Sequence, residues 1–175
     1  MSLLVKAAQG NGNLLLNVGP RGDGSVPEAS LDILREVGRW LKDCGEAIYD
    51  TDLFTFDYEV RGDHRGDWHP NGPFTAKGKT LYQILRYWPG ESVTVAGLRT
   101  EVTAAALVSA AGTQELAFAQ NGGRVDVTGM PAQPPDKVAP VLKLECRDEP
   151  EVYLTGGMRI PKVPHPPYDA TVTAT

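Results

Sequence analysis

The chain opens with a short apolar run and continues with a longer amphipathic stretch. Residues 14–18 are almost uninterruptedly apolar, with Gly and Asn before them and Gly19-Pro20 after them. An unbroken apolar run indicates a strand that is buried on both faces, as in the parallel sheet of an α/β fold. This part therefore predicts a parallel strand over Leu14–Val18.

Helical spacing begins after Pro27. Proline is favoured in the first turn of a helix, and glycine, here Gly45, commonly ends one. Between them apolar residues recur every three or four positions, which predicts an amphipathic helix. The apolar stripe consists of Leu31, Leu34, Val37, Leu41 and Cys44, with Ile33 and Trp40 beside it.

Short strands dominate from residue 73 to residue 147. Apolar or alternating runs are separated there by Pro-Gly, Gly and Asn-Gly-Gly, which are typical turn sequences. Strands at this spacing indicate a small antiparallel β-sandwich. The six predicted strands cover residues 81–88, 92–95, 102–108, 115–119, 124–128 and 138–146.

Two further segments complete the predicted division of the chain. Residues 51–72 form a polar, charged connector between the strand–helix unit of residues 1–50 and the sandwich of residues 73–147. Residues 148–175 form a tail, and nine of the fourteen prolines follow residue 130. Such a proline density predicts an extended, polyproline-type arm.

Composition limits the class of protein and its partners. The chain has 175 residues, of which 41% are hydrophobic and 22% charged, so a wholly disordered or fibrous protein is excluded. The net charge of −5 makes nucleic acid and anionic membranes poor partners. Two cysteines do not make a disulfide framework, no apolar run approaches the roughly 20 residues of a membrane span, and the first residues do not resemble a signal peptide.

Several motifs of the first fifty residues occur in the order found in one enzyme family. The segments Asn13–Pro20, Asp23-Gly24, Glu36–Lys42 and Gly45–Tyr49 resemble the α-L-fucosidases of glycoside hydrolase family 29. The resemblance implies the last strand and helix of a catalytic barrel, followed by a β-sandwich. It is looser over residues 73–147, where Phe74–Tyr82 and Trp88–Gly90 look like the start of the sandwich, and it does not extend to the connector or the tail.

A complete barrel does not fit in this chain. A (β/α)8 barrel needs eight strands and about 250 residues, whereas only one strand–helix unit precedes the antiparallel part. The expected fold is therefore mixed, with one strand–helix unit from a barrel followed by a small antiparallel β-sandwich. We expect the chain to be the C-terminal part of a longer enzyme, whether through a truncated gene or by cutting. The family resemblance implies that the parent enzyme is secreted or periplasmic.

The resemblance also implies which chemistry the parent performs. Such fucosidases hydrolyse terminal α-L-fucosyl linkages of glycans by a retaining mechanism, with two carboxyl groups about 5–5.5 Å apart. The nucleophile Asp and the usual acid/base Glu come from earlier barrel loops, and no position here matches them, so we assign no catalytic residue, cofactor or metal ligand. The residues expected at the rim of the substrate pocket are Asn17, Gly19, Pro20, Arg21 and Asp23, although Gly19-Pro20 and Asp23-Gly24 also fit a purely structural role as turn residues.

The remaining candidates have simpler interpretations. Asp63, His64, Asp67 and His69 have the chemistry of metal ligands, but without an apolar shell they fit a solvated loop better. Trp68 is either a sugar contact or an anchor between the two parts. The aromatic residues Tyr82, Tyr87 and Trp88 are expected to pack between sheets, and Cys44 and Cys146 to be buried thiols.

Three functions remain open at this stage. We favour an inactive accessory region whose sandwich supports the missing catalytic barrel. A stand-alone fucose-binding module and a self-associating domain are the alternatives, the last because the edges of the Leu14–Val18 strand would be open. In each case the apolar stripe of the helix needs a cover, which within this chain is only the sandwich.

Overall fold

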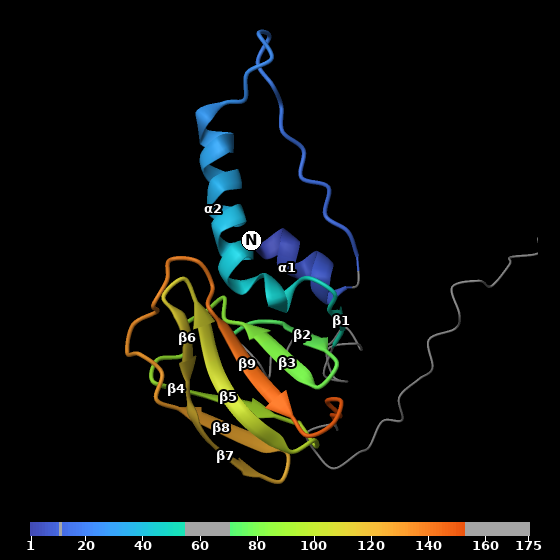
Figure 1. Ribbon diagram of the computed structural model, residues 1–175, viewed down its shortest axis with the longest axis vertical. Helices are drawn as coiled ribbons and strands as arrows, with labels where there is room; N and C mark the ends of the chain where they lie inside the picture. Colours follow the sequence, from blue (N-terminus) through green and yellow to red (C-terminus); the bar gives the residue numbers. More distant parts are fainter. Residues whose placement is uncertain (11, 55–70, 153–175) are drawn as a thin grey trace, which may run out of the picture.

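In the described part of the chain, two helices, a six-stranded sheet and a three-stranded sheet form three layers (Figure 1). The computed structural model describes residues 1–10, 12–54 and 71–152. The six-stranded sheet has the order β1-β2-β3-β9-β5-β6 and the three-stranded sheet the order β4-β8-β7. The elements are α1 (Ser2–Gln9), α2 (Glu28–Cys44), the 3₁₀ turn η1 (Gly45–Ala47), β1 (Asp52–Leu53), β2 (Phe74–Lys77), β3 (Thr80–Ile84), β4 (Ser92–Ala96), β5 (Val102–Ser109), β6 (Gly112–Glu115), β7 (Ala117–Asn121), β8 (Arg124–Thr128) and β9 (Val141–Cys146).

The antiparallel sandwich predicted from the strand pattern is confirmed. Strand β9 lies between β3 and β5, and Leu144 pairs with Leu81 on one side and Ala105 on the other. Side chains alternate along β9, so that Leu142 and Leu144 enter the core between the two sheets. The β7–β8 hairpin turns at Gly122, whose φ of 57° suits glycine, as the Asn-Gly-Gly sequence predicts.

Several predicted strand limits are wrong, for local reasons. Strand β3 ends at Ile84 instead of residue 88, because Arg86 N donates to Ile84 O and the chain turns there. The predicted strand 115–119 is two strands in different sheets. Between them Leu116 is buried in the core, and its N–H still bonds Ala105 O at 2.9 Å.

Both ends of the sandwich extend beyond the predicted limits. Strand β1 lies in the predicted connector and pairs with β2. At the other end Leu98 forms an isolated bridge with Val152, which lies in the predicted tail. The described parts of these two segments therefore contact the sandwich, whereas the remainder lies outside the described residues.

The predicted amphipathic helix is confirmed as α2, and its foot covers the outer face of the six-stranded sheet. Trp40 and Cys44 are buried there with Ala47 of η1. They pack against outward side chains of three strands, which are Tyr82 and Ile84 of β3, Val108 of β5 and Val141 of β9. The large sheet is thus covered on both faces where α2 packs on β3, β5 and β9, whereas β6 is exposed.

The predicted strand over Leu14–Val18 is not formed. Residues 13–20 make no backbone hydrogen bond with other described residues, and the side chain of Leu15 is 92% exposed. A strand needs a hydrogen-bonding neighbour, and no strand among the described residues lies beside this one. The helix stripe is likewise covered only at its foot, since Ile33 and Leu34 remain exposed. Neither α1 nor α2 has the length and apolarity that would let a helix cross a membrane.

One turn provides a stability test of the sandwich. A Cβ on Gly72, at φ 148°, would lie 1.8 Å from Ile84 O, whereas a Cβ on Gly78, at φ 53°, would meet open space. We expect Gly72→Ala to lower the free energy of unfolding by about 3 kcal/mol or more, because backbone must move. Gly78→Ala, with only left-handed strain, should cost about 1 kcal/mol in the same urea titration. Equal losses for the two variants would contradict this account.

Candidate functional site

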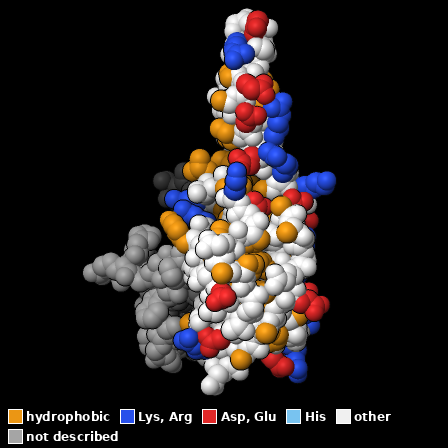
Figure 2. Space-filling view, turned by 90° about the vertical axis from the view of Figure 1, so that its left-hand side faces the viewer, with side chains coloured by type: hydrophobic (Ala, Val, Ile, Leu, Met, Phe, Trp, Pro, Cys, Tyr) orange, Lys and Arg blue, Asp and Glu red, His pale blue; other side chains and the backbone are white. Residues whose placement is uncertain are grey.

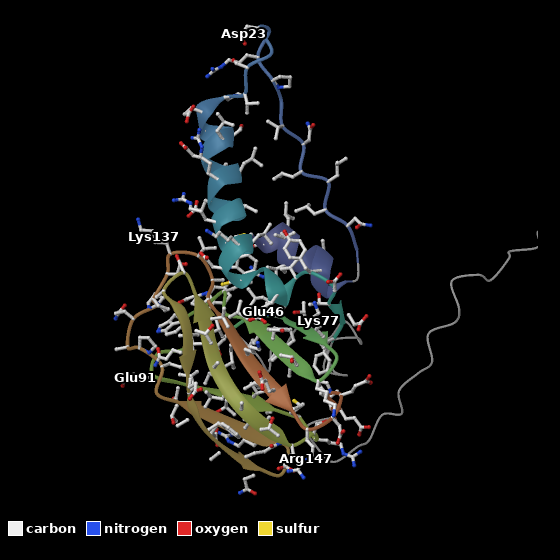
Figure 3. All side chains as sticks on the ribbon, viewed as in Figure 1. Asp23, Glu46, Lys77, Glu91, Lys137 and Arg147 are labelled. Atoms are coloured by element: carbon white, nitrogen blue, oxygen red, sulfur yellow. The ribbon has the colours of Figure 1, made fainter. Side chains whose placement is uncertain are left out.

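The rim residues predicted from the sequence lie on an exposed projection. The projection consists of the extended segment 13–20, the tip turn 21–25 and the upper part of α2, and Asp23 marks its outer end (Figure 3). All five predicted rim residues are solvent-exposed: Asn17, Gly19, Pro20, Arg21 and Asp23.

The tip turn is held by its own hydrogen bonds. Ser25 donates to Asp23 Oδ1 through its backbone N at 2.9 Å and through its Oγ at 2.7 Å. These bonds lower the pKa of Asp23, the hydroxyl bond most. Arg21 N bonds Ser25 O at 2.8 Å, and Gly24 has a φ of 83°, which favours glycine. The turn is therefore preformed, with Asp23 in a structural role within it.

An uncovered apolar surface lies along this projection. Orange side chains follow the projection and gather where it joins the body of the molecule (Figure 2). Charged neighbours on α2, such as the Arg35–Glu28 ion pair, occupy other positions of the helix. The exposed large apolar residues of this region are Leu3, Leu14, Leu15, Leu16, Ile33 and Leu34.

At the foot of α2 a charged and an aromatic side chain meet one carboxylate. Tyr82 Oη donates to Glu46 Oε2 at 3.2 Å, and Lys143 Nζ donates to the same oxygen at 3.0 Å. Burial first, and then the charge of Glu46, raise the pKa of Tyr82 to about 12. Beside this cluster Trp40 Nε1 donates to Ala139 O at 2.7 Å. Glu46 of η1, labelled in Figure 3, thus forms a polar joint with Tyr82 and Lys143 of the sheet. No sequence motif predicts this joint.

An open cleft of about 390 Å³ lies between α1, α2 and two sandwich loops. Tyr87, which is 63% exposed, forms part of its wall, and the guanidinium of Arg86 lies 5.8 Å from the ring centroid of Tyr87. Among the described residues that line the cleft, Glu36 is the only carboxylate.

The prediction that three aromatic residues pack between the sheets is confirmed for Trp88, but it is wrong for Tyr82, which lies on the outer face of the large sheet, and for Tyr87. Tyr82 is buried under α2, and Trp88 packs against the core, where its Nε1 donates to Pro131 O at 3.2 Å. Tyr87 was expected to be buried with Leu81, but it is exposed because β3 ends at Ile84 and the alternation of the strand stops there.

The other candidates from the sequence divide by whether the structure describes them. The Asp63, His64, Asp67 and His69 cluster and Trp68 lie outside the described residues. Within 1–10, 12–54 and 71–152, no three His, Cys, Asp or Glu side chains lie close enough to hold a metal ion.

Comparison with known proteins shows what these features are similar to. The family model for alpha-L-fucosidase matches residues 1–46. Tissue alpha-L-fucosidase of Bos taurus is 37% identical over 89 residues, which cover 51% of this chain and 17% of that protein. Plasma alpha-L-fucosidase of Homo sapiens is 38% identical over 87 residues, or 49% and 17% of the two chains.

Solved structures extend the likeness into the sandwich. Alpha-L-fucosidase isoenzyme 1 from Paenibacillus thiaminolyticus is 30% identical and matches with a TM-score of 0.65, over 82% of this chain and 33% of that one. In sequence and in fold the chain is therefore similar to part of an α-L-fucosidase. The α-L-fucosidase from Vibrio sp. strain EJY3 matches with a TM-score of 0.70 over 85% of this chain and 25% of that one, at 19% identity, and so shows the shared fold.

The aligned part of this chain spans less than a fifth of the length of the Bos taurus and Homo sapiens relatives. The family model covers α1, the extended segment, the tip and all of α2. The uncovered projection is therefore the part of the chain that the fucosidase family model describes.

The two buried thiols provide one test of the packing under α2 and of the sandwich core. Burial raises the pKa of Cys44 to about 12 and that of Cys146 to about 11, so thiolate is scarce in the folded protein. With 5,5′-dithiobis(2-nitrobenzoic acid) at neutral pH we expect no rapid reaction of the native protein and reaction of both thiols in guanidinium. A rapid reaction of the folded protein would show that at least one of the two thiols is not buried.

The polar joint provides a second test. Glu46→Gln removes the negative charge that pairs with the partly buried Lys143. It also replaces the carboxylate that accepts the hydrogen bond of Tyr82 Oη. We expect a loss of about 1–2 kcal/mol in the free energy of unfolding, measured by urea titration. The matched control Glu28→Gln breaks the 2.6 Å pair with Arg35 on the exposed side of α2 and should change stability little. A larger loss of unfolding free energy in Glu28→Gln than in Glu46→Gln would show that the polar joint does not stabilise the fold.

Proposed function

We propose that this chain is the accessory part of an α-L-fucosidase, comprising the strand–helix unit that completes the catalytic barrel and the β-sandwich that supports it. In this proposal residues 1–50 belong to the barrel, 51–72 connect the two parts, 73–147 form the sandwich and 148–175 the tail. The nucleophile and the acid/base belong to earlier barrel loops. The chain alone is then inactive.

The observation that carries this proposal is the uneven cover of α2. Its foot is fixed to the sandwich through Trp40, Cys44 and the Glu46–Lys143 pair, whereas Ile33 and Leu34 above remain exposed. Exposed leucines and isoleucines along one projection indicate a surface that another protein layer covers. The wall of a barrel fits, because in such barrels each helix packs on the strands beside it.

The proposal also gives the exposed tip a role. If segment 13–18 is the last barrel strand, Asn17, Gly19, Pro20, Arg21 and Asp23 lie at its carboxyl end. Active sites of these barrels are built at that end. The five residues then form part of the rim of a pocket for the terminal α-L-fucosyl group of a glycan. Arg21, the exposed cation of the preformed turn, is the rim side chain best suited to contact the sugar.

Activity of the chain alone tests the proposal directly. With 4-nitrophenyl α-L-fucoside we expect no release of nitrophenol above buffer, while the Paenibacillus thiaminolyticus enzyme serves as the positive control. Nitrophenol release that persists after purification of the chain would contradict the proposal that the chain alone is inactive. In a parallel amide NMR titration with millimolar L-fucose we expect no shifts. Shifts clustered at the cleft would instead favour a carbohydrate-binding module.

A chimera tests the supporting role. This chain would replace the matching third of the Paenibacillus thiaminolyticus enzyme, which aligns with it at 30% identity. We expect the chimera to hydrolyse the fucoside, and Leu34→Asp in it to abolish activity and lower the melting temperature. The control Glu28→Gln, on the same helix, should leave both unchanged. A Leu34→Asp chimera that kept full activity would show that this face is not covered by the barrel.

A further inference from the structure

The turn that follows η1 holds an exposed tyrosine in a fixed position. Tyr49 is 55% exposed, and its backbone N donates to Gly45 O at 2.8 Å. A Cβ on Gly45 would lie only 2.8 Å from Cε2 of the Tyr49 ring. Gly45 has an ordinary helical φ of −64°, so glycine is needed there for this close approach and not for its conformation. One side of the ring therefore lies against the end of α2, while more than half of the residue is open to solvent.

The residue after this tyrosine has a strained backbone. Among the non-glycine residues that the structure describes, Asp50 alone has a left-handed φ, at 56°. Such a φ is disfavoured for an L residue, although aspartate tolerates it better than most. Within the described part of the chain the Asp50 carboxylate gains little in return, because its side chain is 87% exposed and its one polar partner is Lys77 Nζ at 3.4 Å. Strain without a compensating contact is typical of ligand sites.

Lys77 brings a cation to the same turn. It is the last residue of β2 and is labelled in Figure 3. Its Nζ donates to Tyr49 O at 3.3 Å and to Asp50 Oδ2 at 3.4 Å. An ammonium has three donors and a carboxylate about four acceptor positions, so both groups keep capacity for a further partner. The turn thus combines an exposed aromatic ring with a donor and an acceptor whose charges cancel.

We propose that Tyr49, Asp50 and Lys77 form a binding site for a neutral saccharide, in which a pyranose ring stacks on the Tyr49 side chain. A pyranose whose hydroxyl groups are all equatorial has flat apolar faces that match an aromatic ring. A sugar hydroxyl group both donates and accepts, so it can bond the Asp50 carboxylate and the Lys77 ammonium together. An ionic ligand would meet a like charge at this turn, which favours an uncharged one.

This site goes beyond the proposed function and rests on it only for the class of ligand, a glycan. Helix α2 is about 25 Å long, with the predicted rim before its first turn and Tyr49 after its last. The site therefore holds sugar units other than the terminal α-L-fucosyl group. Its residues line neither the open cleft nor the exposed stripe of α2 that the proposed function assigns to the barrel.

Amide NMR of the 175-residue chain tests the binding. The probe is methyl β-cellobioside, which is uncharged and has only equatorial ring substituents. We expect saturable shifts centred on Tyr49, Asp50 and Lys77, with a dissociation constant of about 1–10 mM for a single stacked ring. L-fucose, with its axial hydroxyl group, is the ligand control and should leave these amides unchanged.

Two tyrosine variants locate the stacking surface. Tyr49→Ala removes the ring and should weaken binding of methyl β-cellobioside about tenfold. The matched control Tyr87→Ala removes a tyrosine that is 63% exposed on the loop after β3, and it should bind the probe like the wild type.

Asp50→Gly separates binding from folding. Glycine adopts a φ of 56° without strain, so the urea midpoint of unfolding should stay the same or rise. The loss of the carboxylate should nevertheless weaken binding of the probe about fivefold. A turn with a purely structural role would show the first result without the second.

Four results would overturn the proposal. The absence of wild-type shifts at about 50 mM probe excludes the site. Shifts centred on Tyr87 would assign sugar binding to the cleft, and equal affinity of Asp50→Gly and the wild type would separate the strain from any ligand. Shifts of Tyr49 that follow protein concentration without sugar would make the ring a protein contact. Because binding is measured without hydrolysis, failure here leaves the proposed function intact, and an inactive chimera leaves this binding measurable.

Discussion

The arrangement of this chain depends on how the foot of α2 covers the outer face of the six-stranded sheet. Without that cover Tyr82, Ile84, Val108 and Val141 would be exposed on a sheet whose other face is already the sandwich core. The Trp40 indole fits because its N–H finds Ala139 O, so a large aromatic ring is buried without an unpaired donor. The Glu46–Lys143 pair then fixes the end of the helix relative to β9.

Fixing only one end of a helix leaves the other end to a different partner. Helix α2 has 17 residues and is therefore about 25 Å long, while its buried residues lie in the last five positions. The sandwich sets the direction in which α2 leaves the body of the molecule, and segment 13–20 runs beside it (Figure 1). The tip turn needs neither partner, because Asp23 and Ser25 hold it locally.

Sequence patterns that act over a few neighbouring positions predicted several elements of this structure. Helix α2, the Asn-Gly-Gly hairpin and the antiparallel sandwich follow from periodicity and turn residues, which act over a few positions. The joint does not, because Lys143 and Glu46 are 97 residues apart and only the assembled sheet brings them together. The burial of Tyr87 was mispredicted because side chains alternate between the two faces only while the strand continues, and β3 ends at Ile84. The burial of Leu14–Val18 was mispredicted because an apolar run does not by itself specify the strands that pair with it.

That last error is also informative about the segment. The apolar run has the composition of a strand buried on both faces, yet its backbone bonds no other described residue and Leu15 is almost fully exposed. Pairing of such a segment costs little conformational entropy, because the fixed foot of α2 already limits where the projection lies. The barrel strand proposed as its neighbour would therefore meet a partly preorganised edge.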